Sequence, residues 1–447
     1  MKRLLALVCI TLCLRDSTAL RMGSMDYEDV SFWMKSGQEN LQRILAHRDI
    51  ENRAKNVIVF VGDGMGISTI TAGRILTGQS KGLSGEEYKL VFEDFPSTGF
   101  SKTYNVDKQV PDSAGTATAM FSGVKCRYRV IGYDAKARYN HCDKAINQLS
   151  KLTTIADWAQ ESGMDTGFVT TTRVTHATPA GLYAHVNNRD WECDSEIPKE
   201  YRECAKDIAR QLVEDAPGNG FKVEGGKIDI AHHHNYAELA LRELSELEEA
   251  VKVALKQVKL EETLIIVTAD HSHSFTVNGY PARGNDILGL ASNMGNTDGQ
   301  RYETLTYANG PGFFTHRRND SKNVNETWID LEEGRNRDNI FYMHMAGQYL
   351  KDDTHGGEDV GVYAIGPYSH LFRSTFEQNY IAHVIAYAAC FKDWPSHCDS
   401  AYSRYFYELS NTRGRSTAGA AATAALSLAP TYTIFTILVL MSILMRP

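Results

Sequence analysis

The sequence predicts an α/β protein of three layers, with a mostly parallel central sheet flanked by helices on both faces. Two short runs, Val57 to Val61 and Leu264 to Val267, are apolar throughout, which is typical of strands buried on both faces. Stretches with helical spacing alternate with these strands, and such alternation favours a parallel sheet. The 447 residues, 43% of them hydrophobic and 23% charged, suffice for one large domain or two.

The charge distribution argues against a nucleic acid partner. The 47 basic residues are spread along the chain, and the net charge is −8. A nucleic-acid-binding protein usually carries a basic tract or patch, and this sequence has no such tract. Any phosphate group must therefore be bound by local groups.

The N-terminus has the composition of a secretion signal. Lys2 and Arg3 precede an apolar run from Leu4 to Leu14, and Ser17-Thr18-Ala19 resembles a signal-peptidase site. We expect residues 1–19 to be a signal peptide and the mature chain to begin near Leu20.

The C-terminus resembles a glycolipid-anchor signal. Residues 411–425 are rich in Ser, Thr, Gly and Ala, and an apolar stretch from Tyr432 to Met445 follows. A short tail-anchor helix is the alternative, but roughly 14 apolar residues fall below the ~20 needed to span a bilayer. We expect an attachment residue within 411–421, a propeptide over about 416–447, and a protein held at the extracellular face of the cell membrane.

Cysteine usage and glycosylation acceptors agree with an exported chain. Cys9 and Cys13 leave with the signal peptide, and the remaining six include no Cys-x-x-Cys pair, which favours disulfides over zinc or redox chemistry. Cys390 and Cys398 are close enough in sequence to bridge a local loop. Asn319 and Asn325 each begin a glycosylation acceptor, which indicates a surface segment. The other two bridges stay open among Cys126, Cys142, Cys193 and Cys204.

The first elements of the mature chain are a helix and a buried strand. Residues 29–48 have helical spacing, with Trp33 and Leu41 on one apolar face. The strand Val57 to Val61 enters Gly62-Asp63-Gly64, so Asp63 is expected at the carboxyl end of the strand, where α/β proteins present ligands. In isolation, a turn aspartate explains Asp63 equally well.

The stretch from Val110 to Met120 predicts a nucleophile at the start of a helix. Asp112 or Ser113 would be the N-cap, and the following Ala and Thr residues give a slim helix face. Such a terminus offers free N–H groups and the positive end of the helix dipole, so a phosphoryl group on Ser113 would be well placed. Taken alone, Ser113 is more simply a capping serine.

The next elements carry the metal candidates. We expect helices over Thr153 to Ser162 and Ala237 to Lys256, the latter with a solvated charged face, and a short strand over Gly167 to Thr170. Asp229 and His233 are four residues apart, so on a helix they point the same way and form a workable zinc pair. The run His232 to His234 fits a solvated helix face as well, but further candidates at predicted strand ends favour a metal centre: Asp63, Asp270, His271 and His355.

Six motifs together resemble those of eukaryotic alkaline phosphatases, in the family's order and over nearly all of the mature chain. They are Val61 to Gly66, Asp112 to Ala117, Thr175 to Gly181, Val223 to Gly226, Thr268 to His273 and Thr354 to Asp359. The resemblance implies a three-layer alkaline-phosphatase-like fold over residues 20–415, with a small crown-like surface lobe at about 279–352. Phosphodiesterase and sulfatase relatives use a threonine or a modified cysteine instead and lack the Asp-Ser-Ala turn.

The resemblance also implies a role for each site residue. Ser113 would be the nucleophile that becomes a phosphoserine, and the Arg189 fork would clamp two phosphate oxygens. One zinc would be held by Asp229, His233 and His355. The second would be held by Asp63, Asp270 and His271 beside Ser113, itself a minor ligand. Magnesium would take Asp63, Thr178 and Glu224, with His176 close by, and His273 would orient Asp229 rather than bind a metal.

Cofactors, reaction and partners follow from the same resemblance. Two zinc ions and one magnesium ion are expected, and the two zinc ions would act as a clamp in an in-line displacement on phosphate monoesters. A glycolipid-anchored homodimer is the expected form. No calcium site is expected, because the lobe that carries it in animal relatives falls in a segment missing here.

Two features depart from the family pattern. Ile230 follows Asp229 where relatives often have histidine, which affects a neighbouring contact but no ligand. Relatives also have well over a hundred residues between the phosphate-clamping arginine and the magnesium glutamate, whereas Arg189 and Glu224 are 35 positions apart here. Residues 221–223 supply a short stub of the strand that delivers Glu224. A catalytically impaired surface protein is therefore the alternative to an active phosphomonoesterase.

Overall fold

The computed structural model of the chain describes residues 28–215, 223–291, 301–317, 329, 331, 337, 339–391 and 398. The expected signal peptide, anchor signal and both glycosylation acceptors lie outside these residues. Among the helices that are described, none combines the length and apolar character needed to cross a membrane.

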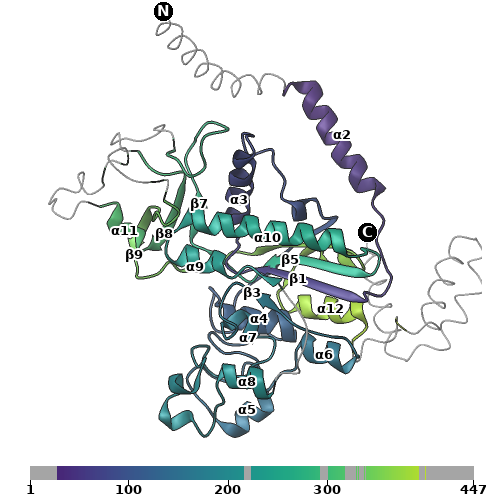
Figure 1. Cartoon of the computed structure of the whole chain (residues 1–447), viewed down its shortest axis with the longest axis vertical. Helices are drawn as coiled ribbons and strands as arrows, with labels where there is room; N and C mark the ends of the chain where they lie inside the picture. Colours follow the sequence, from purple (N-terminus) through teal and green to yellow (C-terminus); the bar gives the residue numbers. More distant parts are fainter. Residues whose placement is uncertain are drawn as a thin grey trace, which may run out of the picture. The chain divides into compact units, whose positions relative to one another are not determined.

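A seven-stranded sheet forms the centre of the molecule (Figure 1), with the strand order β12-β2-β11-β5-β1-β4-β3. In this sheet β11 is antiparallel to both of its neighbours, and the other recorded pairings are parallel, as predicted. The strands are β1 (Asn56–Gly62), β2 (Ser97–Lys102), β3 (Val169–Thr170), β4 (Val223–Glu224), β5 (Thr263–Ala269), β11 (Val360–Ile365) and β12 (Ser374–Glu377).

Helices cover both faces of this sheet, which confirms the predicted three layers (Figure 1). Alternate residues of the buried strands enter different cores, because successive side chains of a strand point to opposite faces. Val59 and Ile266 pack with α4, α6, α7 and α12, whereas Phe60 and Val267 pack with α3, α9 and α10. The bounds are α3 (Ile67–Ser80), α4 (Ser113–Ser122), α6 (Ile155–Glu161), α7 (Ala177–Ala180), α9 (Lys227–His233), α10 (Ala237–Gln257) and α12 (Tyr380–Ala389).

Two smaller sheets and several short helices complete the fold. The strands β7 (Phe275–Val277), β8 (Leu305–Gly310) and β9 (Ala346–Tyr349) form a separate three-stranded sheet beside α11 (Gly312–Thr315), and β8 and β9 fall within the expected surface lobe. β6 (Ser272–His273) and β10 (His355–Gly356) pair antiparallel. The other helices in the described part of the chain are α2 (Val30–Ala46), α5 (Lys144–Ser150), α8 (Ile208–Glu214), η1 (Val91–Asp94), η2 (Asp194–Glu196), η3 (Lys199–Tyr201) and η5 (Ser369–Phe372).

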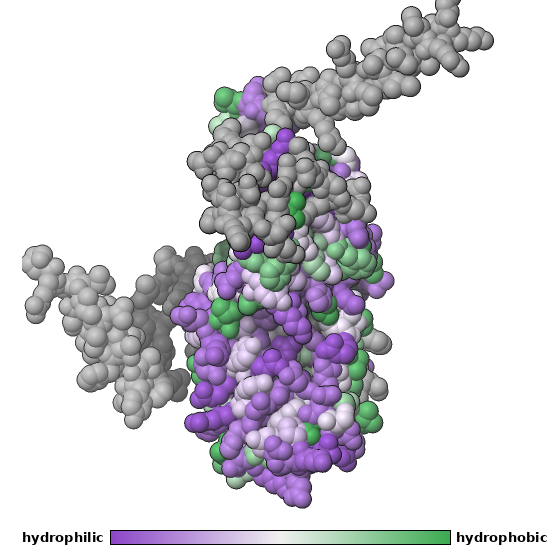
Figure 2. Space-filling view, turned by 90° about the vertical axis from the view of Figure 1, so that its left-hand side faces the viewer, coloured by the Kyte–Doolittle hydropathy of each residue, from purple (hydrophilic) through white to green (hydrophobic). Residues whose placement is uncertain are grey.

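The first expected helix is α2, and its apolar side chains are exposed. The Asp29 carboxylate caps it by accepting the backbone N–H of Phe32. Trp33 and Leu41 are 57% and 58% exposed, so this face is not part of the described core. In contrast, the face of the main body drawn in Figure 2 is mainly hydrophilic, with apolar residues in smaller groups between the polar ones.

The disulfide expectation is correct in part. Cys142 and Cys204 form a bridge, and Cys390 and Cys398 are each disulfide-bonded. The expectation of three bridges is wrong, because Cys126 and Cys193 carry free thiols. Cys126 is buried and Cys193 is exposed.

The strand β4 of the central sheet is short. β1 pairs with β5 along its whole length, from Asn56 to Gly62, but its described pairing with β4 covers only Phe60 and Val61. A cavity of about 130 Å³ lies next to this short pairing. The cavity is lined by Asn56, Val57 and Val59 of β1 on one side, and by residues 165–167, just before β3, on another.

Candidate active site

Ser113 is the first residue of α4, and its hydroxyl faces histidine and carboxylate groups. The Asp112 carboxylate accepts the N–H groups of Ala114 and Gly115, each at 3.3 Å, so Asp112 and not Ser113 is the cap. Ser113 Oγ therefore remains available and lies 3.1 Å from His271 Nε2 and 3.5 Å from Asp63 Oδ1. Buried at the positive end of the helix dipole, this hydroxyl is well placed for a phosphoryl group.

The parallel pairing of β1 and β5 brings Asp63 and Asp270 together. Gly62 pairs with Ala269, so the residues that follow them leave the sheet at the same edge. Asp270 accepts the N–H groups of Gly64 and His271 at 3.0 and 2.8 Å through Oδ1. His271 Nε2 lies 3.2 Å from Asp270 Oδ2 and 3.5 Å from Asp63 Oδ1. Asp63, Asp270 and His271 thus form one compact group of possible metal ligands.

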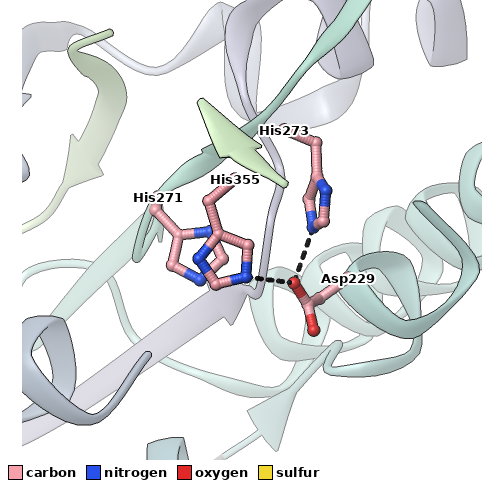
Figure 3. Close-up of side chains that lie close together, drawn as sticks. All are labelled: Asp229, His271, His273 and His355. Carbon is pink, nitrogen blue, oxygen red and sulfur yellow. Dashed lines mark hydrogen bonds and ion pairs between the residues drawn. The ribbon is translucent and has the colours of Figure 1, made fainter. Parts of the chain in front are cut away.

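A second group of possible metal ligands consists of Asp229, His271, His273 and His355 (Figure 3). Asp229 and His233 share one side of α9, as predicted, and β10 delivers His355 from the far end of the chain. The Nε2 atoms of His233 and His355 are each 3.4 Å from Asp229 Oδ1 and 3.2 Å from each other. Figure 3 shows His271 and His355 overlapping, and their stacked rings are 3.6 Å apart, so the two groups adjoin.

The hydrogen bonds of these rings leave nitrogen atoms available as metal ligands. His233 Nδ1 donates to the carbonyl of Asp353 at 2.6 Å, and His355 Nδ1 donates to that of Pro111 at 2.9 Å. Each Nε2 then presents a lone pair, and the two lone pairs face each other and the Asp229 carboxylate. A metal ion bound between these atoms would accept both lone pairs and balance the charge of the carboxylate. Nitrogen and carboxylate donors at such separations suit zinc.

The protonation equilibria agree with this arrangement. Burial lowers the pKa of His233 to about 4 and also lowers that of His271, so both rings are neutral at neutral pH and can act as ligands. Burial would also lower the pKa of His273, but hydrogen bonds to Asp229 and Asp353 outweigh it and raise the pKa to about 9. His273 is thus held between two carboxylates, with Nε2 at 2.6 Å from Asp229 Oδ1.

The structure describes the side chains of some, but not all, of the residues expected around magnesium. Thr178 donates its hydroxyl to Asp63 Oδ2 at 2.8 Å, and His176 Nδ1 lies 3.9 Å from the same oxygen. The backbone of Glu224 ends β4 opposite Val61, two residues before Asp63, but its side chain lies outside the described part of the chain. Hydroxyl and carboxylate oxygens of this kind suit magnesium.

Arg189 reaches the same centre from a loop. It donates from Nη1 to Asp112 Oδ2 at 3.1 Å, and its Nη2 lies 3.1 Å from His176 Nε2. Burial lowers the pKa of His176 to about 3, so this ring is neutral and accepts the hydrogen bond from Arg189. The guanidinium is thereby fixed next to the cap of α4, one residue from Ser113.

Comparison with known proteins identifies the family. The family model described as alkaline phosphatase matches residues 54–219 and 215–391. The chain belongs to the alkaline phosphatase family. "Alkaline phosphatase 4" of Drosophila melanogaster is 39% identical over 505 residues, which cover 83% of this chain and 84% of that protein. The tissue-nonspecific isozyme of Gallus gallus is 35% identical, over 84% of this chain and 92% of that protein. Among solved structures, alkaline phosphatase from the Antarctic bacterium TAB5 is 20% identical, with a TM-score of 0.48, and the match covers 77% of this chain and 100% of that one.

Two details of these matches concern the middle of the sequence of this alkaline phosphatase. The family model matches in two stretches that meet at residues 215–219. The alignment with the fruit-fly relative extends over 505 positions but uses only 83% of this chain of 447 residues, so more than a hundred of its positions have no counterpart here.

Sequence patterns did not reveal every residue of this alkaline phosphatase site. His232, one of the three adjacent histidines, is buried between Thr69 and Tyr307, with hydrogen-bond distances of 3.0 and 2.8 Å. It therefore has a packing role. Two further residues of the site are not predicted by any sequence pattern: Thr116, which donates to Asp270 Oδ2 at 3.1 Å, and Asp353. The sequence signal was weak: Thr116 lies one turn after Asp112, and Asp353 closely precedes His355.

Proposed function

We propose that this alkaline phosphatase hydrolyses phosphate monoesters to an alcohol and inorganic phosphate through a phosphoserine at Ser113. The observation that carries this proposal is the buried hydroxyl of Ser113 at the start of α4, within 3.1 Å of His271 Nε2 and 3.5 Å of Asp63 Oδ1. A capping serine would accept backbone N–H groups, and here Asp112 does so instead.

The reaction has two displacements at phosphorus. First, Ser113 Oγ bonds to phosphorus while the bond from phosphorus to the alcohol oxygen breaks, and the alcohol leaves with a proton. Then water attacks phosphorus, the bond to Ser113 Oγ breaks, and orthophosphate departs while the serine regains its proton. The Arg189 fork would bind two oxygens of the transferring group, and the N–H groups at the start of α4 would face a third.

We assign the metal ligands by donor type. The first zinc site would consist of Asp229, His233 and His355, and the second zinc site of Asp63, Asp270 and His271 with Ser113 as a minor ligand. The magnesium site would take Asp63, Thr178 and Glu224, with His176 beside it. When bound, the zinc ions supply Lewis-acid stabilisation of the attacking and leaving oxygens of an in-line displacement.

Zinc removal tests the function directly. We expect a chelator to lower p-nitrophenyl phosphate turnover at alkaline pH by at least about 100-fold, because Lewis-acid stabilisation is worth several kcal/mol. Added zinc should restore turnover, whereas the same chelator presaturated with zinc should have no effect. Undiminished turnover by protein shown to be free of zinc would contradict the proposal.

A second candidate is a catalytically impaired surface protein. It is favoured by the two-residue strand β4 and the cavity beside β1. We propose that a segment of the family's core is missing between Arg189 and Glu224, and the two-part family match that meets at residues 215–219 supports this. Both candidates keep the same ligands and differ in how rigidly these are held.

We further propose that the protein is an extracellular enzyme anchored to the cell membrane by glycosylphosphatidylinositol. The support is the composition of residues 411–447. A phospholipase specific for this anchor is therefore expected to release most of the enzyme from intact cells into the medium, as measured by immunoblotting. Retention on cells, with a known anchored protein released in the same sample, would favour a tail-anchor helix.

We also infer a glycosylated homodimer. The acceptors at Asn319 and Asn325 support glycosylation. The homodimer rests on the family resemblance, and the exposed apolar side chains of α2 are consistent with a further partner surface. A single protomer mass in light scattering of the purified protein would argue against the dimer.

A further inference from the structure

Asp353 is a buried carboxylate that touches the expected ligands of the first zinc site without being one of them. It is 1% exposed. Its Oδ2 accepts the Nδ1–H of His273 at 2.9 Å, and its Oδ1 accepts the hydroxyl of Ser274. His273 in turn holds Asp229 Oδ1 through Nε2 at 2.6 Å. Since both nitrogens of His273 have a carboxylate partner, the ring cannot swivel without breaking one of these bonds. Asp353 thus fixes Asp229 through His273.

The backbone of Asp353 fixes a second ligand. Its carbonyl accepts His233 Nδ1–H at 2.6 Å, and its N–H donates to the carbonyl of His233 at 2.8 Å. The first bond sets the tautomer and the ring orientation of His233, so that Nε2 points at Asp229. The second bond ties the end of α9 to the segment before β10.

The same segment also positions the third ligand. His355 follows Asp353 by two residues and pairs with His273 across β6 and β10. Between them, Thr354 exchanges two hydrogen bonds with the side chain of Asn309, at 2.9 Å each. Asp353 therefore lies at the point where His233, His273 and His355 are tied to one another.

We propose that Asp353 is the positioning residue of the first zinc site: it holds Asp229 through His273, holds His233 through its carbonyl, and so sets the zinc affinity of that site. This inference rests on the proposed zinc-dependent function and extends it to a residue that binds neither metal nor substrate. Partners that orient metal ligands typically contribute 10- to 100-fold to metal affinity.

Zinc affinity of the purified full-length protein measures this role without relying on catalysis. The zinc affinity of the first zinc site is measured by competition with a chromogenic chelator. It should be about 10- to 100-fold lower in Asp353→Ala than in the unchanged protein. Asp353→Asn keeps the shape and one acceptor, so it should give a smaller loss in a protein that still folds. Asp352→Ala is the matched control, because Asp352 is an exposed carboxylate at the neighbouring position, and its zinc affinity should stay within about 2-fold.

The pathway through His273 is tested by a double-mutant cycle. In a His273→Gln background, Asp353→Asn should cost much less zinc affinity than it does in the unchanged protein. The melting temperature at saturating zinc should change little in Asp353→Asn, which separates ligand positioning from a general loss of stability.

The outcomes separate this inference from the proposed function. If the unchanged protein binds zinc and turns over substrate, but Asp353→Ala binds zinc equally tightly, the positioning role is wrong while the function stands. The positioning role is also wrong if Asp353→Asn lowers zinc affinity by the same factor in the His273→Gln background as in the unchanged protein. A protein that binds no zinc at all overturns the function and the inference together.

Discussion

Replacing Ser113 by alanine is expected to lower phosphomonoester turnover by at least about 1,000-fold, because the variant has no oxygen to receive the phosphoryl group. Zinc content should stay near normal, since three other groups hold each zinc in the proposed assignment. The measurements are p-nitrophenyl phosphate turnover, labelled phosphate trapped on the protein in acid, and zinc by elemental analysis.

Ser122→Ala is the matched control for this substitution. Ser122 is also a buried serine of α4, and its hydroxyl donates to the carbonyl of Thr118 within the same helix, far from the ligand groups in sequence. Turnover of this variant should stay within a few-fold of the unchanged protein. Labelled phosphate trapped on the Ser113→Ala protein would show that another residue is the nucleophile.

Restoring a family-length segment between Arg189 and Glu224 is expected to raise turnover by roughly 100-fold, because misplacing reacting groups by about 1 Å can cost that much. Glu224 ends a strand of two residues, and Asp229 lies five residues later on α9. The described pairing of β4 with β1 covers only Phe60 and Val61, and a cavity borders the first part of β1. We expect this short pairing to hold both ligands less rigidly than a full-length strand would. Zinc occupancy and melting temperature should rise together with turnover.

The inserted sequence would be the corresponding segment of the fruit-fly relative, placed within residues 216–222. A flexible Gly/Ser insertion of equal length is the matched control and should give no gain, since it supplies neither a strand nor apolar side chains. The segment is dispensable if the chain as it stands already matches a full-length relative under the same conditions.

The sequence by itself determined the features that depend on short stretches of chain. Asp229 and His233 were predicted to share a helix side because four residues make about one helical turn, and α9 has this geometry. The apolar runs predicted β1 and β5, and parallel pairing then made Asp63 and Asp270 neighbours. The mostly parallel sheet, its two helical layers and the family followed from the order of these motifs.

Tertiary structure decided the roles that depend on partners distant in the chain. His232, His233 and His234 are adjacent in sequence, yet the contacts of Thr69 and Tyr307 bury His232 in the core while His233 faces Asp229. Whether two cysteines pair depends on where the folded chain carries them, so spacing left Cys126 and Cys193 undecided and the structure keeps both free.

Asp353 is the clearest example of a residue whose role cannot be predicted from the sequence. In the sequence it is one of two adjacent aspartates before a threonine and a histidine, and nothing local distinguishes it from Asp352. Only folding buries Asp353 against His273 and His233 and leaves Asp352 exposed. The physical reason is that local backbone preferences act over a few residues, whereas burial and hydrogen bonding depend on segments that meet only when the whole sheet has formed.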